Sequence, residues 1–239
     1  MQDGLYVALS SQIALQKRLT TIADNVANSG TVGFRATGVR FEDLVDGLGS
    51  DAVSFASAGE SYIETASGSL RETGNPFDFA IEGEAWFAID TPAGQVMTRD
   101  GRFTMLDTGE LVTLEGHPVL DAGGAPLLLD PLAGPPEAGA DGLLRQNGNL
   151  VGAIGLYEYQ PGENHTRYGN SGFLPEVPPL PVVDRPGVGV VQGFLEQSNV
   201  NPMLEMTRLI QVQRAFENVT TLMRDSDTAL KDALKMLST

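Results

Sequence analysis

The stretch "IADNVANSGTVGFRA", residues 22–36, ends a strongly helical N-terminal segment and decides how the chain continues. Up to Val26 an apolar stripe recurs at steps of three and four residues, and Asn, Ser and Gly then interrupt it. Asn and Gly tolerate the left-handed conformations of helix C-termini and of the turns that follow. The sequence therefore predicts a helix that ends between Asn25 and Gly33, after which Phe34 and Phe41 anchor the returning chain.

The stripe before this turn has a counterpart at the other end of the chain. In both segments the steps alternate between three and four, and this mean spacing of about 3.5 residues is typical of a coiled-coil seam. The stripes comprise Leu5, Ala8, Gln12, Leu15, Leu19, Ile22 and Val26, and then Leu209, Val212, Phe216, Val219, Met223, Ser226, Leu230, Ala233 and Leu237. Asn201 and Pro202 suit the cap and first turn of the second helix. We expect the two helices to pair as a coiled coil, with an ordinary amphipathic pair on a globular core as the alternative.

The middle of the chain has the pattern of a β-rich body. The 239 residues include 28 Gly and 14 Pro, and short alternating or apolar runs are separated by Asp-Gly, Thr-Gly and Glu-Gly turns. The fold class predicted is α+β, with an all-β domain inserted between the terminal helices. The expected division is an assembly helix and turn (1–35), an extended connection (36–80), a β-rich outer domain (81–189), and a connecting strand with the second helix (190–239).

The charge is distributed very unevenly along the chain. The net charge is −16, but residues 1–30 and 203–239 are each neutral, so the acidic excess lies entirely in the middle. Nucleic-acid binding is not expected, because phosphate contacts need clustered Lys and Arg. There is no cysteine, no run of about 18 apolar residues, and no basic region typical of a cleaved signal peptide. We predict a protein without membrane-spanning segments or disulfides.

Residues that could carry catalysis are sparse. His117 and His165 are the only histidines, and neither stands in a metal-binding spacing. Glu82 and Glu84 share one face of a strand and are expected to be solvated, while Trp86 is expected in the core. No dinucleotide-binding glycine motif or nucleophile elbow occurs. The sequence therefore predicts no catalytic, cofactor-binding or metal-binding residues, and no small-molecule substrate.

Four separated motifs resemble those of the flagellar rod and hook (axial) proteins. They are "LYVALSSQIALQKRLTTIADNVANSGTVGFRA" (5–36), "TGNPFDFAIEGEAWFAI" (73–89), "MTRDGRFTMLDTGELVTLEGHPVLD" (97–121) and "QGFLEQSNVNPMLEMTRLIQVQRAFE" (192–217). Their order is that of the family, and together they span nearly the whole chain. Asp24 and Ala85 depart from the family pattern, which usually has Asn and Gly there.

This resemblance implies a structural subunit of the basal-body rod, most like the proximal rod subunits, with the distal rod subunit as the alternative. Such proteins are exported without a cleaved signal through the flagellar type III channel, and their terminal helices build the inner layer of a helical tube in the periplasm. The implied partners are copies of the chain and other rod proteins, with basal-body ring proteins left open. The assembly residues expected on this basis are Leu5, Leu15, Leu19, Ile22, Asn25, Val26, Asn28, Phe34, Ser198, Asn199, Val200, Leu209, Val212, Phe216, Val219, Met223, Leu230 and Leu237.

Two interpretations from other classes remain open at this point. A periplasmic enzyme acting on the cell wall would need an acid or a nucleophile in a cleft, and the sequence offers no such set. A secreted binding module with a coiled-coil stalk would form closed dimers or trimers through the same stripes.

Overall fold

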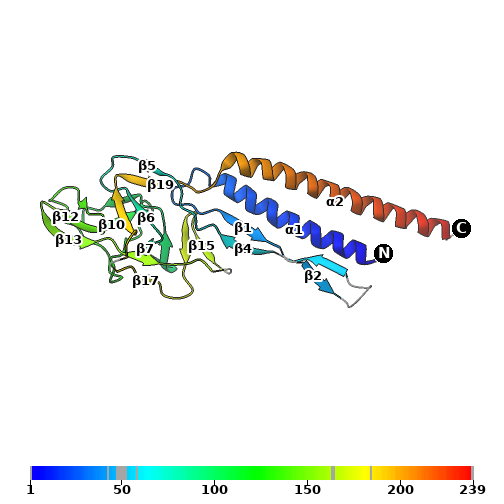
Figure 1. Ribbon diagram of the computed structural model, residues 1–239, viewed down its shortest axis with the longest axis horizontal. Helices are drawn as coiled ribbons and strands as arrows, with labels where there is room; N and C mark the ends of the chain where they lie inside the picture. The colour runs from blue at the N-terminus through cyan, green and yellow to red at the C-terminus, as the bar shows by residue number, and fades with distance from the viewer. Residues whose placement is uncertain are drawn as a thin grey trace. The chain divides into compact units, whose positions relative to one another are not determined.

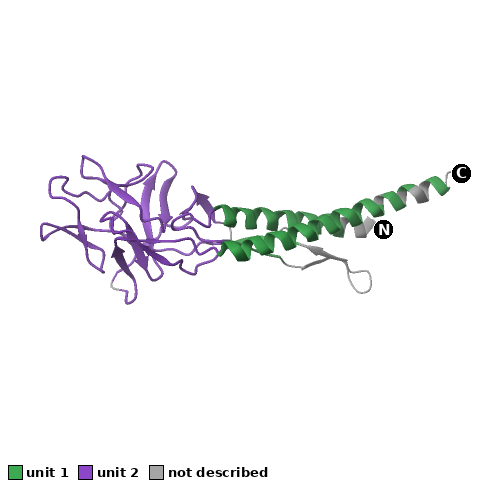
Figure 2. Ribbon diagram, turned by 90° about the horizontal axis from the view of Figure 1, so that it is seen from above, with its two compact units in different colours: residues 1–27, 37–62, 201–239 green, residues 28–36, 63–200 purple. Residues whose placement is uncertain are grey.

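The computed structural model describes residues 2–41, 43–46, 53–57, 59–162, 165–183 and 185–237. Side-chain burial is described for these residues except 2–6, 43–46, 53–56, 227, 230, 232–234 and 237. The chain forms two compact units (Figure 2). Unit 1 comprises residues 1–27, 37–62 and 201–239, and unit 2 comprises residues 28–36 and 63–200.

Unit 1 contains the two long helices, which lie side by side (Figures 1 and 2). Helix α1 spans Gln2–Ala27 and helix α2 spans Pro202–Leu237. The predicted cap of the second helix is confirmed, because the side-chain Oδ1 of Asn201 accepts a hydrogen bond from the backbone N–H of Leu204 at 3.2 Å. The first helix ends, as predicted, where the Asn- and Gly-containing turn begins.

Short strands accompany the helices in unit 1. Strand β1 (Thr37–Arg40) pairs with β4 (Glu60–Ile63), and β2 (Asp43–Asp46) pairs antiparallel with β3 (Val53–Ala56). Helix α1 contacts β1 and β3 as well as α2. Helix α1 therefore packs against α2 with one part of its surface and against strands with another part.

The predicted coiled coil is wrong: in chain order two helices flank a β-rich middle, and a coiled-coil seam is not seen among the described side chains. A coiled coil needs a continuous row of apolar side chains, each inserted among four residues of the facing helix. Among the described side chains of α1, from residue 7 on, the buried apolar ones are Ala14 and Ile22, and Ala14 lies outside the predicted stripe. Among the described side chains of α2, Val212 is the one buried apolar residue. The architecture is α+β, in which α1 packs against both α2 and strands.

Unit 2 is built on a six-stranded sheet with the order β15-β16-β8-β7-β14-β17. These strands are β7 (Trp86–Thr91), β8 (Gly94–Thr98), β14 (Leu156–Glu158), β15 (Thr166–Tyr168), β16 (Gly172–Leu174) and β17 (Leu180–Pro181). The central pair is an antiparallel hairpin that places Phe87 opposite Thr98 and Thr91 opposite Gly94. β17, in the proline-rich segment, is an edge strand, as expected for a strand that cannot donate a full set of hydrogen bonds.

Smaller ladders complete unit 2, and several of them join distant parts of the chain. The strands are β5 (Leu70–Glu72), β6 (Phe79–Glu82), β9 (Phe103–Met105), β10 (Leu111–Thr113), β11 (Glu137–Ala138), β12 (Leu143–Gln146), β13 (Asn149–Ala153), β18 (Gly189–Gln192) and β19 (Phe194–Glu196). β9 pairs with β10, and β12 lies between β11 and β13. β18 pairs with β6 and β19 with β5, so the last strands before α2 return to the first strands of the unit.

Two apolar clusters form the core of unit 2. The larger one surrounds the rings of Phe79, Phe87 and Phe103, and the Phe87 and Phe103 rings meet edge to face at 5.3 Å. The second contains Trp86, whose ring lies edge to face with Phe173 at 5.5 Å. The expectation that Trp86 belongs to the core is confirmed.

Candidate assembly surfaces

Asn25, in the last turn of α1, is held by the strand that follows the turn. Its Nδ2 donates to the backbone oxygen of Thr37, and its Oδ1 accepts from the Thr37 backbone N–H, both at 2.9 Å. The amide therefore completes a pair of hydrogen bonds of the kind exchanged between paired strands, and the side chain is buried. This contact gives Asn25 a role within the chain that an aliphatic residue of similar size would not fulfil.

The turn after α1 requires glycine at one position. Gly33 has φ +69°, and a Cβ atom there would lie 2.4 Å from the backbone carbon of Arg99 and from the backbone nitrogen of Asp100. The Gly33 N–H donates to the backbone oxygen of Glu196 at 2.8 Å. Just before it, the hydroxyl of Thr31 lies 3.1 Å from Asn28 Oδ1. The turn is therefore packed directly on the segment that precedes α2.

Phe34 is buried and is covered by a guanidinium group. The Cζ atom of Arg167 lies 4.6 Å from the centroid of the Phe34 ring and 4.8 Å from that of Phe173. Arg167 Nη2 also donates to the backbone oxygen of Arg35 at 2.6 Å. Phe34 thus anchors the returning chain, as the sequence predicted, but its ring is not exposed for contacts with another molecule.

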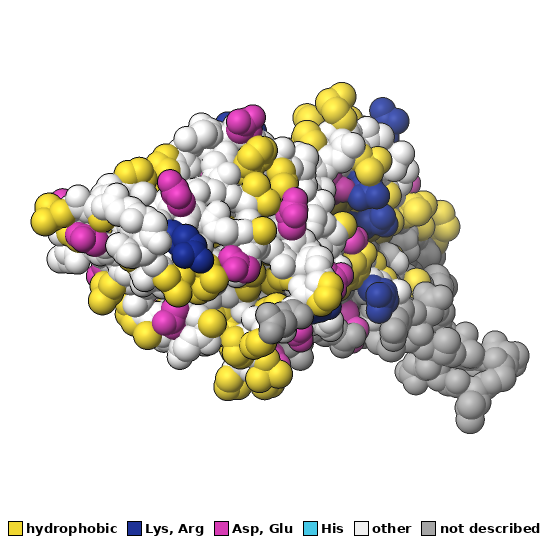
Figure 3. All heavy atoms as spheres, turned by 60° about the vertical axis from the view of Figure 1, so that its left-hand side comes forward, with side chains coloured by type: hydrophobic (Ala, Val, Ile, Leu, Met, Phe, Trp, Pro, Cys, Tyr) yellow, Lys and Arg dark blue, Asp and Glu magenta, His cyan; other side chains and the backbone are white. Residues whose placement is uncertain are grey.

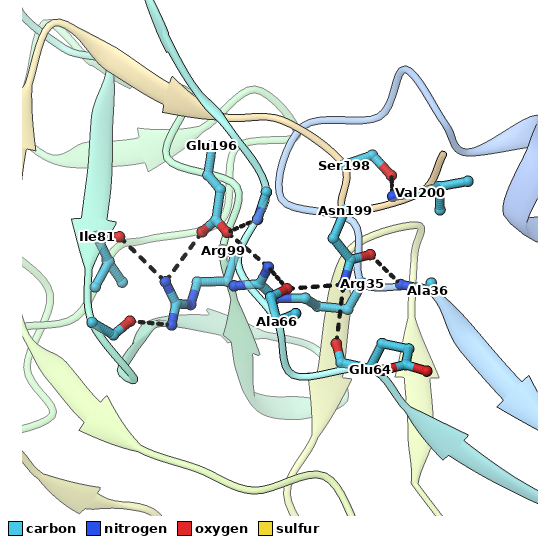
Figure 4. Close-up of polar contacts among 12 residues, drawn as sticks. Arg35, Ala36, Glu64, Ala66, Ile81, Arg99, Glu196, Ser198, Asn199 and Val200 are labelled. Carbon is cyan, nitrogen blue, oxygen red and sulfur yellow. Dashed lines mark hydrogen bonds and ion pairs between the residues drawn. The ribbon is translucent and has the colours of Figure 1, made fainter. Parts of the chain in front are cut away.

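A buried cluster of charges follows Phe34 (Figure 4). Glu196 Oε1 lies 2.7 Å from Arg35 Nη1, and Glu196 Oε2 lies 3.1 Å from Arg99 Nη1. All three side chains are at most 3% exposed. The arginines also donate to backbone oxygens, Arg35 to Ala66 at 2.6 Å and Arg99 to Gly83 at 2.7 Å. One carboxylate therefore joins the segment after α1, strand β19 before α2, and the loop after β8.

The cluster holds two guanidinium groups against a single carboxylate. Burial is the largest effect on both arginines: it lowers the pKa of Arg35 and brings the pKa of Arg99 to about 10, while Glu196 opposes the shift. Among the described residues, Arg35 Nε and Nη2 and Arg99 Nε have no hydrogen-bond partner. The face of Trp86 lies 5.4 Å from the Arg99 Cζ and 6.0 Å from that of Arg35, and its π electrons offset part of the excess positive charge.

Asn199 makes a second connection beside this cluster (Figure 4). Its Oδ1 accepts from the backbone N–H of Ala36 at 2.7 Å, and its Nδ2 donates to the backbone oxygens of Glu64 and Ala66 at 3.2 and 2.9 Å. Ser198 Oγ accepts from the backbone N–H of Val200 at 3.2 Å, and Val200 is buried. These residues hold the segment 198–200 against the strands and turn of unit 2.

The predicted stripe residues lie mainly on inward-facing positions of unit 1. Ile22 and Val212 are buried. The partly exposed members are Leu15, Leu19, Val26, Leu209, Phe216, Val219 and Met223. The side chains of Leu5, Leu230 and Leu237 lie outside the described residues.

Sequence reasoning missed the apolar side chains that the helices leave exposed. On α2, Met203, Met206 and Ile210 follow one another at steps of three and four and are 75%, 51% and 52% exposed. On α1, Leu9 and Ile13 are 45% and 55% exposed at a spacing of four. Each set therefore shares one face of its helix. The sequence signal for them is the same spacing of three and four residues, counted from Met203 on α2 and from Leu9 on α1.

Unit 2 presents a different surface. Figure 3 shows acidic side chains dispersed singly among uncharged and apolar ones on the face in view, with few basic side chains. Two of the unit's few arginines, Arg35 and Arg99, are in the buried cluster. The exposed surface of unit 2 is therefore more acidic than its composition alone indicates.

The described residues contain no group of three or more His, Cys, Asp or Glu side chains that could hold a metal ion. His117 Nε2 lies 3.7 Å from Glu115 Oε2 and 3.4 Å from the hydroxyl of Tyr168, at the surface of unit 2. No helix among the described residues is long and apolar enough to cross a membrane.

Comparison with known proteins places the chain in a family. The model "Flagella basal body rod protein" matches residues 5–35, "Flagellar hook protein FlgE/F/G D1 domain" matches residues 80–138, and "Flagellar basal body rod FlgEFG protein C-terminal" matches residues 191–236. These three regions contain the end of α1, the hairpin with Arg99, and the segment from Glu196 into α2. The buried cluster therefore draws one residue from each matched region.

Full-length relatives agree with these models. Flagellar basal-body rod protein FlgF of Mesorhizobium japonicum is 68% identical, over 99% of this chain and 98% of the relative. FlgF of Rhizobium meliloti is 56% identical over the same shares, and FlgG of Bacillus subtilis is 29% identical over 99% of each chain. The family predicted from the four motifs is confirmed. The chain belongs to the flagellar basal-body rod protein family.

Proposed function

We propose that this chain is a structural subunit of the flagellar basal-body rod, in the proximal rod. Two relatives named FlgF are 68% and 56% identical over nearly the full length of both chains, and this high identity supports the proximal over the distal position. The role is mechanical: copies polymerise through their terminal helices into a helical tube that transmits torque and surrounds the export channel.

The observation that carries the assembly mechanism is the apolar face that α2 leaves exposed. Met203, Met206 and Ile210 are each more than half exposed on one side of a helix. Fully burying one such side chain contributes about 1.5–3 kcal/mol. Association of two molecules costs about 4–15 kcal/mol in lost freedom, so several such side chains must be buried together. A subunit that contacts several neighbouring copies buries several of these side chains at once.

The exposed apolar face of α1 and that of α2 are two different surfaces. Contact between two different surfaces of neighbouring copies favours an open polymer over a closed dimer. A face of α2 that contacts a face of α1 in the next copy is a head-to-tail interface, which extends into a filament unless its rotation closes a ring. The neutral charge of residues 1–30 and 203–239 supports the close approach of many such segments. Copies of this chain and other rod proteins are the partners, and the acidic unit 2 remains available to basal-body ring proteins.

The place of action follows from this role. The subunit works in the periplasmic part of the basal body, which it reaches through the flagellar export channel without a cleaved signal. No catalysis, cofactor or nucleic acid is needed for it. The family is a structural one, and this membership supports a non-enzymatic role.

The test is the double substitution Met206→Asp with Ile210→Asp, introduced into a strain that lacks the native gene. We expect loss of swimming and of rod assembly, because two carboxylates at the centre of an assembly contact would each be desolvated. The matched control is Gln211→Asp, an exposed polar position on the same helix that lies off the face shared by Met203, Met206 and Ile210. The purified double variant should keep its helical circular dichroism and its Trp86 fluorescence.

Normal swimming of the double variant would overturn the assembly mechanism. Release of fragments from purified murein by the wild-type chain would instead favour the cell-wall enzyme. A closed dimer or trimer of the purified chain in analytical ultracentrifugation would favour the secreted binding module, because a rod subunit should remain a monomer until it meets its partners.

A further inference from the structure

A cleft of about 420 Å³ lies within unit 2 and contains none of the buried charge cluster. Its walls come from three parts of the chain: the end of β5 with the turn after it, the loop that leads into β11, and the junction of β18 and β19. Volumes of about 300–1,000 Å³ are typical of sites that receive a ligand. No residue of the cleft belongs to α1 or α2, so the helix contacts proposed above do not involve it.

One side chain holds the walls of the cleft together. Gln192 Nε2 donates to the backbone oxygens of Pro76 at 2.6 Å and of Pro136 at 2.7 Å, while its Oε1 accepts a backbone N–H of β11 at 3.0 Å. The backbone oxygen of Gly193 accepts the N–H groups of residues 73 and 74 at 2.8 and 3.1 Å. These bonds form within the chain before any partner binds, so little conformational freedom is lost when the cleft is filled.

An aromatic ring and three prolines give the cleft an apolar lining. The prolines are Pro76, Pro135 and Pro136. Phe194 is partly exposed, and among the described residues it belongs to neither apolar cluster of the core and meets no other aromatic ring. A ring that the core does not cover can stack on a flat group of another molecule.

Two carboxylates, and no basic side chain, line the cleft. Glu72 stands directly opposite Phe194 in the β5–β19 ladder, so its side chain lies on the same face as the ring. Glu137 is also exposed, and the ion pairs of the described residues involve neither carboxylate. Arg71 and Arg145 stand beside these carboxylates in the strand or in the ladder, but neither lines the cleft. A cationic group is therefore the complement of this lining.

We infer that the cleft binds an arginine side chain of a different protein. A guanidinium group is planar, so its face can stack on the Phe194 ring while its edge donates paired hydrogen bonds to a carboxylate. Lysine carries a point charge without a flat face and complements only the carboxylates. The acidic excess of the chain lies in its middle, so a second copy of unit 2 is repelled and a basic partner is attracted. This inference is independent of assembly through the helices.

The first test titrates the isotope-labelled full chain with the capped tripeptide acetyl-Gly-Arg-Gly-amide and follows the backbone N–H signals by NMR. We expect the signals of Gly74, Gly193 and Phe194 to shift and to saturate, because these residues line the cleft. The matched probe has Lys in place of Arg and should bind about tenfold more weakly, since it loses a paired hydrogen bond and the stacking contact. Both probes carry the same charge, so general attraction to the acidic surface cannot produce this difference.

Variants of the full chain assign the binding to the cleft. Glu72→Gln and Glu137→Gln should each weaken the Arg tripeptide severalfold, whereas Glu115→Gln, at a carboxylate that is 74% exposed outside the cleft, should leave it unchanged. Phe194→Leu keeps an apolar side chain but removes the flat ring, so it should bring the affinities of the two probes closer together. The N–H signals outside the cleft show that each variant is folded. Equal affinity for the two probes, shifts that do not saturate, or an unchanged affinity of Glu72→Gln would show that the cleft does not bind arginine.

A photo-crosslinking benzophenone amino acid then identifies the source of the arginine, in motile cells that carry the variant chain in place of the native one. It is placed at Pro135, which lines the cleft, or at Leu132 of the same loop, which is 94% exposed and lies outside it. We expect an adduct with a different protein that is about tenfold stronger from Pro135, with Arg in the crosslinked peptide of the partner. No adduct, equal adducts from both positions, an adduct with this chain only, or a partner peptide without Arg would overturn the docking of a different protein. Swimming of the same cells shows in each case that the assembly role is intact.

Discussion

The inside of unit 2 and the outside of unit 1 reverse the usual distribution of polar and apolar side chains. Unit 2 buries two arginines and a glutamate at the junction of its first and last segments. Unit 1 exposes Met203 and Ile210, two large apolar residues, on a helix face. Charges are specific in their geometry but costly to bury, and apolar faces are favourable to bury but tolerant of their partner.

This reversal separates two tasks. The buried cluster fixes one arrangement of three chain segments, because moving any of them leaves a guanidinium or a carboxylate without its counter-charge. The exposed helix face does not fix anything within the chain and gains stability only when another surface covers it. The predictions below test this contrast, starting with the largest expected effect.

Glu196→Ala should destabilise unit 2 by about 3–5 kcal/mol, because it leaves Arg35 and Arg99 buried without a counter-charge. Urea unfolding followed by the fluorescence of Trp86, the only tryptophan, measures this change in the unit that contains the cluster. Glu72→Ala, on the strand that pairs with β19, is the control and should change stability by less than about 0.5 kcal/mol. An equal loss of unfolding free energy in both variants would show that the buried Glu196 stabilises unit 2 no more than the exposed Glu72 does.

Val212→Ala and Met206→Ala compare a buried and an exposed apolar residue on the same helix. Val212 is buried, so its truncation should cost about 2 kcal/mol through lost burial and a residual cavity. Met206 is half exposed, so its truncation should stay within about 0.5 kcal/mol. Unfolding followed by circular dichroism at 222 nm reports on α1 and α2. If Met206→Ala destabilised the isolated chain as much, its side chain would be part of the chain's own core and not of an assembly face.

The smallest expected effect is a pH dependence confined to unit 2. Burial, followed by a weaker contribution from Arg167, lowers the pKa of His165, although a hydrogen bond to the Gly162 oxygen opposes this. The unfolded chain then binds the proton first, so the stability that neutral His165 contributes is present above about pH 6.5 and is lost as the pH falls through the folded pKa.

Both histidines lie in unit 2, so the helices should not share this effect. The urea midpoint from Trp86 fluorescence should fall slightly between pH 7 and pH 5.5, and His165→Gln should reduce that fall. A fall of the same size in the variant would assign it to other groups.

Local patterns in the sequence were sufficient to predict the helices and much of the strand content. The Asn201 cap and the turn at Gly33 depend on neighbouring residues, and both predictions agree with the structure. The coiled coil was wrong because an apolar stripe does not reveal how many partners share it, and α1 also packs on β1 and β3.

The buried cluster could not be predicted for a related reason. Arg35, Arg99 and Glu196 stand in three different motifs, and nothing in the spacing within a motif shows that their side chains meet. The one available signal was a charged residue at the end of the apolar run "GFLE" in a predicted strand. The exposed face with Met206 was missed because only one stripe per helix was considered.

The hydrogen bonds around Gly33 and Asn199 also determine how the protein bears load. The Gly33 N–H bond to Glu196 and the Asn199 bond to Ala36 connect the segment leaving the first helix with the segment entering the second. A pull on either segment is therefore resisted by these bonds and the buried ion pairs together. Tension in the segment that follows the first helix is therefore transmitted, within unit 2, to the segment that precedes the second helix.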